Sequence, residues 1–393
     1  MNEKVTTARR RTIGLLCVGV VATASLLSSS AAPASRSAQP LVKVTPRQLF
    51  LSQPVDALAA DSGRAAFAFC RQLVGVWKPG SSGITRLGRL NQWTCPPPLG
   101  PQTVLTLAIA RDRIAWAVDE GGIQVNNFLF LATLTHPHTL KLAAEVNSCC
   151  RGEPGQEKMG DVFGDRNFIV FSTRLNCSDF GAPACPAGTT RPTLFSQTVW
   201  RVRRPPFSAT CVDKPGTCQQ LVSVAGAVDP LSVDTGHVVA REANGTLIVW
   251  DFKGAFVQTF SAGVGKSPAA ELMGNNRLVV LLPGHVLLFN IVTGLQLRDR
   301  AVPAVPSGGV CGIPPCSTAT LRLVDAARGL VAYILSHKLH LLRTRDGKDV
   351  QAARADVTDA RFGDTGLFYS FKTTGQWPGR IRFVPWRQLA LRP

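Results

Sequence analysis

The sequence is poor in charge, and especially in acidic side chains. Charged residues make up 17% of the chain and hydrophobic residues 45%, while 25 Asp and Glu stand against 43 Lys and Arg. This composition excludes a disordered chain, which needs low hydrophobicity and high charge. Most Asp residues lie at expected turns, where they stabilise the backbone; examples are Asp61, Asp119, Asp234, Asp346 and Asp364.

Catalytic and metal-binding signatures are also missing. The absence of Gly-x-Ser-x-Gly excludes a nucleophile elbow. There is no Cys-x-x-Cys, and no histidine stands at ligand spacing from a cysteine pair, so we expect neither a metal nor a cofactor. The spacing of His337 and His340 places them on opposite faces of a strand. A carboxylate pair assembled by folding, from Glu153, Asp179 or Glu242, stays open.

No apolar run reaches the roughly 20 residues of a membrane-spanning helix. Ile13 to Leu27 comes nearest; Arg9 to Arg11 precede it, and Ala32-Pro33-Ala34 follows, a small-x-small cleavage pattern. This order predicts a cleaved signal peptide at 1–34 and a bacterial protein that is secreted or held in the cell envelope, without a permanent membrane span. An uncleaved anchor is the alternative, and the Sec and twin-arginine routes stay open.

The net charge of +18 raises the question of an anionic partner. The basic residues are scattered along the chain, apart from Arg201, Arg203 and Arg204. No run interleaves them with aromatic residues, as a nucleic-acid groove needs. We therefore expect no nucleic-acid partner and place the arginines at solvated positions.

Helical periodicity is absent. Instead, a pattern of three apolar strand segments separated by turns repeats along the chain. The copy at 237–260 has an Asn-Gly hairpin turn, which favours the positive φ of tight hairpins. The copies at 277–299 and 329–350 follow the same plan. Trp250, Phe289 and Leu342 hold equivalent places, 39 and 53 residues apart, and a spacing of this order is typical of β-propellers.

Weaker copies complete the series, at 64–90, 104–134, 167–224 and 356–386. Together they predict an all-β, seven-bladed β-propeller over residues 53–393, because strands without helices between them exclude a βαβ plan. The last copy is one strand short. The segment 35–52 contains Gln48 to Leu51, which we expect to supply the missing strand and close the ring.

The Trp250-Asp251 pair and the turn pattern resemble those of WD40 and YVTN-type propellers. The resemblance covers most of the mature chain, as architecture only. The Gly-His pair of WD40 repeats is missing, and the Trp-Asp pair occurs in one copy. The resemblance implies the fold and a scaffold role, and it carries over no catalytic residues.

Ten cysteines follow the signal segment, an even number that indicates disulfides in an oxidising compartment. Their spacing predicts five local pairs: Cys70–Cys95, Cys149–Cys150, Cys177–Cys185, Cys211–Cys218 and Cys311–Cys316. A bridge between adjacent cysteines strains the intervening peptide. Cys149 and Cys150 crossing over to Cys177 and Cys185 therefore remains an alternative.

All of these cysteines except Cys211 and Cys218 lie in, or directly beside, loops expected on one face of the propeller. Those loops run from the second to the third strand of a blade, or from one blade to the next. Long loops on a rigid scaffold often carry function, so this face is the predicted binding surface. Its candidate residues are Trp93, Arg151, Glu153, Asp179, Glu242, His285, His337 and Trp377.

The sequence therefore predicts a non-catalytic monomer that binds a protein or a cell-envelope polymer through this disulfide-held face. The alternative is an exported propeller hydrolase or lyase with its site at the mouth of the central channel. Converging carboxylates in a pocket would favour the enzyme. Exposed aromatic rings such as Trp93 or Trp377 would favour binding.

Overall fold

The described part of the chain begins at Pro40. The computed structural model describes residues 40–393 except 91–92, 96–101, 121–124, 149–155, 167, 177–193, 203–217, 224–227, 243, 265–267 and 305–319. The predicted signal peptide and several predicted cysteine pairs therefore lie outside the described residues.

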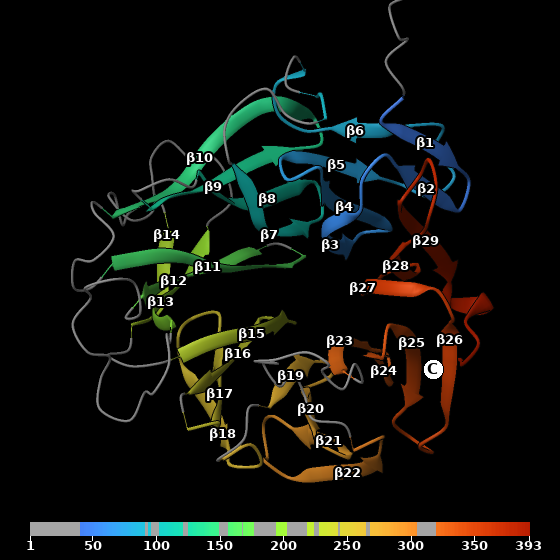
Figure 1. Ribbon diagram of the computed structural model, residues 1–393. Coiled ribbons are helices and arrows are strands. Elements are labelled where there is room, and N and C mark those ends of the chain that lie inside the picture. Colours follow the sequence, from blue (N-terminus) through green and yellow to red (C-terminus); the bar gives the residue numbers. More distant parts are fainter. Residues whose placement is uncertain are drawn as a thin grey trace, which may run out of the picture. The chain divides into compact units, whose positions relative to one another are not determined.

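Antiparallel sheets surround a common centre (Figure 1). Each four-stranded sheet places its first strand innermost, and the five-stranded sheet places β27 there. These inner strands contact one another in a closed series, β3–β7–β11–β15–β19–β23–β27–β3. The chain is thus an all-β β-propeller, as the sequence predicts.

Six sheets have four consecutive strands each. The first two hold β3 (Val55–Asp61), β4 (Arg64–Phe69), β5 (Leu73–Trp77) and β6 (Ile84–Arg86), then β7 (Thr103–Ala110), β8 (Arg113–Asp119), β9 (Val125–Thr133) and β10 (His136–Ser148). The next two hold β11 (Gln156–Asp165), β12 (Phe168–Asn176), β13 (Leu194–Val202) and β14 (Cys218–Ser223), then β15 (Val228–Asp234), β16 (His237–Glu242), β17 (Leu247–Asp251) and β18 (Phe256–Phe260). The last two hold β19 (Ala269–Leu272), β20 (Arg277–Leu282), β21 (His285–Asn290) and β22 (Gln296–Ala301), then β23 (Leu321–Ala327), β24 (Leu330–Leu335), β25 (Lys338–Arg343) and β26 (Asp349–Ala353).

The remaining sheet is built differently, from strands near both ends of the described chain. Its order is β1-β2-β29-β28-β27. Its members are β1 (Val42–Thr45), β2 (Gln48–Leu51), β27 (Asp356–Gly363), β28 (Gly366–Lys372) and β29 (Gly379–Pro385), and the short 3-10 helix η2 (Trp386–Gln388) follows. The prediction of a seven-bladed propeller is therefore correct only in part: six sheets are regular four-stranded blades, and the remaining sheet has five strands from both ends of the described chain.

Strand β2 pairs with β29 in antiparallel register, Gln48 opposite Arg382 and Leu51 opposite Gly379. Leu49 and Leu51 are fully buried and pack with Ile381, Phe383 and residues of the first blade. The segment that the sequence singles out is thus a strand of this sheet.

Tight hairpins connect the first and second strands of most sheets. At Thr235-Gly236 φ is 48° and 81°, and at Arg328-Gly329 it is 51° and 80°. Two successive positive φ values define the hairpin turn whose twist matches that of the flanking strands. These turns end the inner strands at one face of the propeller, which we call the hairpin face. The opposite face, which carries the second-to-third-strand loops and the blade-to-blade loops, we call the loop face.

The repeat alignment read from the sequence is confirmed by the strand registers. Trp250 pairs with Val238, Phe289 with Leu278 and Leu342 with Val331. In each case the partner is the second residue of the second strand of a blade. Trp250, Phe289 and Leu342 therefore hold equivalent places in their blades.

Candidate functional site

The loop face carries the disulfide Cys70–Cys95, as predicted, with a sequence separation of 25. Cys70 and Arg71 form the turn between β4 and β5, with φ of 53° and 65°. The backbone N–H of Arg71 donates to Asp56 Oδ2 at 2.8 Å, and its carbonyl accepts from the N–H of Val104 at 2.7 Å. The turn is thus fixed to the inner strand of its own blade and to that of the next blade.

The predicted exposure of Trp93 is wrong. Its side chain is only 8% exposed and lies against Phe69, with 5.9 Å between ring centroids. The indole N–H donates to the carbonyl of Leu87 at 3.0 Å. Trp93 stands two residues before Cys95 and packs in the core beside Phe69, so it presents no exposed ring on the loop face.

The other described candidates do lie on the loop-face side, without forming one cluster. His285 and His337 are exposed, and each Nδ1 lies 3.0 Å from an aspartate, Asp299 and Asp356 respectively. Trp377, in the β28–β29 loop, is half-buried, and its carbonyl accepts from Thr373 Oγ1 at 2.7 Å. Glu242 ends β16 and is half-buried.

Several further predictions lie outside the described residues. They concern Arg151, Glu153, Asp179 and the pairings of the cysteines from Cys149 to Cys218 and from Cys311 to Cys316. Cys218 is described only as the first residue of β14. These pairings stay predictions.

Breaking the described disulfide should lower stability. Replacing both Cys70 and Cys95 by Ser releases a loop with a sequence separation of 25, which corresponds to about 3 kcal/mol of chain entropy. We expect a lower urea midpoint for the double variant than for the wild type under oxidising conditions. Equal midpoints would contradict a stabilising role for this bridge.

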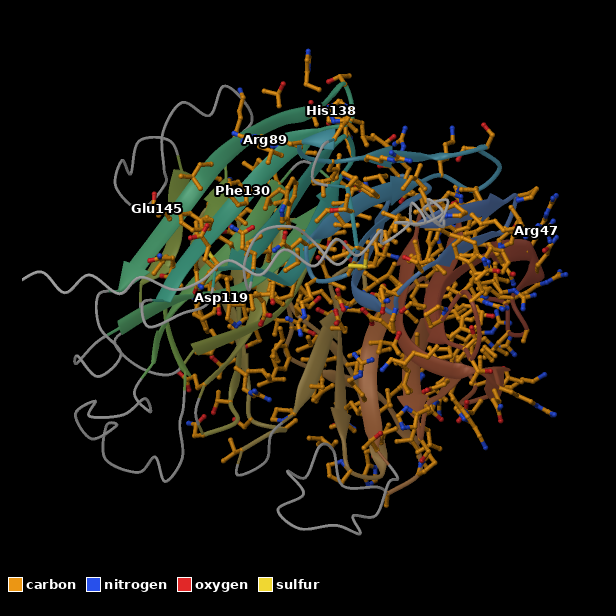
Figure 2. All side chains as sticks on the ribbon, turned by 45° about the horizontal axis from the view of Figure 1, so that its top comes forward. Arg47, Arg89, Asp119, Phe130, His138 and Glu145 are labelled. Carbon is orange, nitrogen blue, oxygen red and sulfur yellow. A yellow bond between two sulfur atoms is a disulfide. The ribbon has the colours of Figure 1, made fainter. Side chains whose placement is uncertain are left out.

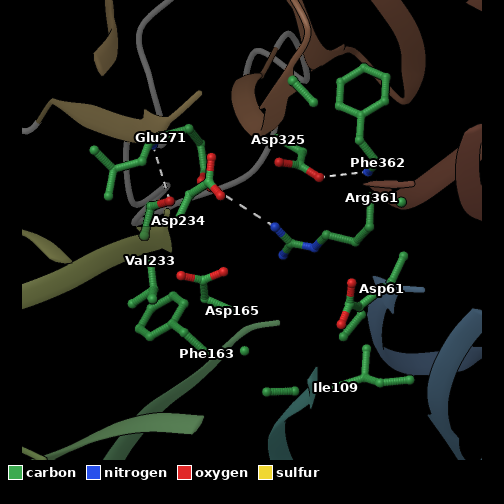
Figure 3. A pocket seen from close by; sticks show the side chains of 18 of the residues that line it. Asp61, Ile109, Phe163, Asp165, Val233, Asp234, Glu271, Asp325, Arg361 and Phe362 are labelled. Carbon is green, nitrogen blue, oxygen red and sulfur yellow. Dashed lines mark hydrogen bonds and ion pairs between the residues drawn. The ribbon is translucent and has the colours of Figure 1, made fainter. Parts of the chain in front are cut away.

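A central channel of about 580 Å³ runs between the inner strands (Figure 3). Although the chain is basic overall, carboxylates outnumber cations in the channel lining. The acidic lining residues are Asp56, Asp61, Asp161, Asp165, Asp234, Glu271, Asp325, Asp359 and Asp364. The cationic lining residues are Arg166, Arg328 and Arg361. The fold therefore concentrates acidic side chains along the central channel, although basic residues are in excess over the whole chain.

Three of these aspartates link neighbouring blades near the hairpin face. Each accepts a hydrogen bond from a backbone N–H in the first hairpin of the next blade: Asp61 from Arg111 at 2.6 Å, Asp165 from Gly236 at 2.8 Å and Asp234 from Gly274 at 2.6 Å. Burial raises the pKa of all three carboxyl groups. They tie neighbouring blades together, so the sequence-based view of Asp61 and Asp234 as backbone-stabilising residues holds, but between blades.

A second group of charges meets inside the channel, around Arg361 of β27. Arg361 Nη1 lies 2.5 Å from the carbonyl oxygen of Val324 and 3.9 Å from Glu271 Oε1. Its Nη2 lies 3.5 Å from Asp359 Oδ2. Asp325 accepts backbone N–H groups from Ala326 at 2.7 Å and Phe362 at 2.6 Å. One guanidinium thus contacts carboxylates from two blades, Glu271 and Asp359, and a backbone carbonyl from a third.

Burial has the largest influence on the pKa values of the carboxyl groups around Arg361. It raises the pKa of Glu271 to about 8, with the charge of Asp325 adding to the effect and that of Arg361 opposing it. Burial likewise raises the pKa of Asp325 to about 6, against the charge of Arg361 and two backbone hydrogen bonds. Sequence reasoning missed Glu271, Asp325 and Arg361. The available signal was a charged residue inside an otherwise apolar strand, as in Ala269–Leu272.

The raised pKa of Glu271 predicts a pH-dependent stability. The folded protein holds this proton more tightly than the unfolded chain, so stability falls as pH rises from the ordinary value of 4.5 to about 8. Glu271→Gln mimics the protonated form and should match the wild type at pH 5. At pH 9 it should exceed the wild type by about 2–4 kcal/mol. Urea unfolding at both pH values measures the difference, and a variant less stable than the wild type at pH 9 would contradict it.

In the ranges that the structure describes, no three His, Cys, Asp or Glu side chains are placed to hold a metal ion. The described part of the chain also contains no helix with the length and hydropathy of a membrane span.

Comparisons with known proteins bear on the fold. No family model matches the sequence, and no curated protein matches it. A chain in the crystal structure of the mitotic checkpoint complex is similar over 92% of this chain and 99% of its own, with a TM-score of 0.50 and 11% identity. The C-terminal WD40 domain of Sif2 reaches 0.48 at 14% identity, covering 85% of this chain and 96% of its own.

BamB from Moraxella catarrhalis has a TM-score of 0.42 at 11% identity, over 86% of this chain and 89% of its own. At such identities a likeness concerns the fold alone. The ring of sheets described above itself shows that the chain is a β-propeller.

Proposed function

We propose that this protein is an exported, non-catalytic β-propeller that binds a protein or a cell-envelope polymer on its loop face. In this proposal residues 1–34 are removed on export, and the mature protein works outside the cytoplasm as a monomer. The five-stranded sheet acts as the seventh blade, and β2 closes the ring. A rigid, closed scaffold then presents the loops.

The observation that carries the proposal is the anchoring of the loop face. The Cys70–Cys95 disulfide and two backbone hydrogen bonds of Arg71 fix the loops around the first blade. The strand ends at this face include three pairs that are widely separated in sequence: β6 and β7, β12 and β13, and β22 and β23.

Capture from an envelope extract of the producing cell tests this function. The immobilised wild type should retain a specific partner, and the loop-face variant His337→Ala/Trp377→Ala should lose it. A matched hairpin-face variant, Thr235→Ala/Asn276→Ala, should retain it. Loss of capture in the hairpin-face variant alone would move the working surface to the other face, and no specific capture by the wild type would contradict the binding function.

The protonated carboxyl of Glu271 favours a second candidate, an exported hydrolase or lyase. A carboxyl with a pKa of about 8 can donate a proton at neutral pH, and it faces a channel of about 580 Å³. Hydrolysis or cleavage of an envelope polysaccharide by the wild type, lost in Glu271→Gln, would support the enzyme. Equal turnover by both proteins would exclude Glu271 as the acid.

A further inference from the structure

The outer part of the five-stranded sheet has no acidic side chains. Residues 40–55 and 366–393 contain no Asp and no Glu. The same two segments supply β1, β2, β28 and β29. Their basic residues are Lys43, Arg47, Lys372, Arg380, Arg382 and Arg387, with Arg392 at the end of the chain. Pairing of the two chain ends therefore creates a positively charged surface that neither segment forms alone.

Strand register places three of these cations on one face of the sheet. Lys43 pairs with Phe50, which pairs with Arg380 on the next strand. Lys43 Nζ lies 5.7 Å and the Arg380 guanidinium 5.0 Å from the centre of the Phe50 ring. Arg382 follows two residues along the same strand, about 7 Å further on. Lys43 and Arg382 are exposed, and no acidic residue of these four strands neutralises them.

The opposite face of the same strands is apolar. Leu49, Leu51, Ile381 and Phe383 are buried there against the first blade. This burial fixes the register, because a one-residue shift would move the leucines to the outer face. The cations are therefore held in a row by the core behind them.

A concave site of about 440 Å³ adjoins this row at the β1–β2 hairpin. It is lined by Thr45, Pro46, Arg47, Gln48, Arg382 and Gln388, together with Phe383 and Val384. Arg47 Nη1 donates to Gln388 Oε1 at 2.6 Å, which holds the guanidinium at the edge of the site. Figure 2 shows Arg47 at the outer edge of the molecule. The site thus offers two guanidinium groups, a hydroxyl and two amides, and its lining contains no carboxylate.

Arg380 adds an independent observation. Its Nε is buried and has no hydrogen-bond partner among the described residues. A buried donor without a partner costs free energy, so an acceptor supplied by a ligand would be stabilising. The unsatisfied donor lies on the strand that also carries Arg382, which lines the concave site.

We propose that this surface, which we call the terminal-sheet surface, binds a linear acidic polysaccharide. Its carboxylates would follow the row from Lys43 past Arg380 to the pocket between Arg382 and Arg47. Spaced cations match a repeating anion better than a single small one. No aromatic side chain of these four strands is exposed, so the surface lacks the stacking platforms of single-strand nucleic-acid sites. The proposal does not depend on the loop face.

Binding of fluorescent polygalacturonate oligomers to the mature protein tests the proposal. We expect binding that weakens as salt is raised, because bound counterions are released on association. The variant Lys43→Gln/Arg382→Gln should bind about tenfold more weakly and depend less on salt. Both residues are exposed, so the fold should tolerate the changes, and an unchanged melting temperature checks this.

The matched control is Lys253→Gln/Arg298→Gln, which removes two exposed cations from other blades. It should bind polygalacturonate like the wild type. The loop-face variant His337→Ala/Trp377→Ala should also keep this affinity, which separates this test from that of the proposed function. An equal loss in the matched control, no binding at low salt, or tighter binding of a single-stranded oligonucleotide of the same charge would each overturn the proposal.

Discussion

Replacing both Leu49 and Leu51 by alanine should cause the largest loss of stability expected for this chain. Both side chains are fully buried between the five-stranded sheet and the first blade. Each truncation of a buried leucine costs about 2–5 kcal/mol. The summed loss in the double variant is therefore comparable to the whole unfolding free energy of a typical domain, about 5–15 kcal/mol. Urea unfolding of the mature protein measures the loss.

A control with exposed leucines separates the effect of lost core packing from that of removing any leucine side chain. Leu90 and Leu295 are 54% and 64% exposed, and the control variant Leu90→Ala/Leu295→Ala should stay within about 1 kcal/mol of the wild type. Deleting residues 40–52 should be at least as damaging as the Leu49/Leu51 change. A deletion that leaves the melting temperature unchanged would show that the ring closes without β2.

Arg361→Met should have the second largest effect, and one that depends on pH. The substitution keeps the volume of the side chain but leaves Glu271 and Asp359 without their shared cation. Removing one partner of a buried ionic group costs about 3 kcal/mol or more when the other stays charged. We expect this loss above pH 8, where Glu271 and Asp325 are both ionised.

At pH 5 the loss should be smaller. Burial raises the pKa of Glu271 and Asp325, so both are largely protonated there and need no cation. Chemical unfolding at pH 5 and pH 9 gives the comparison, and Arg361→Met/Glu271→Gln should recover part of the loss at pH 9. A destabilisation that is the same at both pH values would show that Arg361 acts through packing alone.

Much of the fold can be predicted from local sequence. Asn244-Gly245, Pro283-Gly284 and Asp346-Gly347 mark turns because their φ requirements are local. The equivalence of Trp250, Phe289 and Leu342 follows from spacing, and the strand registers confirm it. The pairing partner of Gln48–Leu51 could be proposed because the last repeat lacks a strand.

The burial of Trp93 could not be predicted in this way. An aromatic residue in a loop near a cysteine fits an exposed binding site or a small satellite core equally well. Contact with Phe69 decides between them.

The distribution of charge also escapes local reasoning. Glu271, Asp325 and Arg361 belong to three blades, and each alone is a single charge in a strand. Lys43 and Arg380 are far apart in sequence and meet only because the two chain ends share a sheet. Folding thus brings basic residues that are scattered in the sequence onto one surface, and it brings carboxylates from several blades into the channel lining.

Hydrogen exchange of the mature protein, alone and with the partner recovered from the envelope extract, tests the central claim most directly. The claim is that the loop face is the working surface. The account predicts slower exchange in the β4–β5 turn around Arg71 and in the β28–β29 loop around Trp377, with no change in the hairpins at Thr235 and Arg328. Protection of those hairpins, with the loop face unchanged, would contradict it.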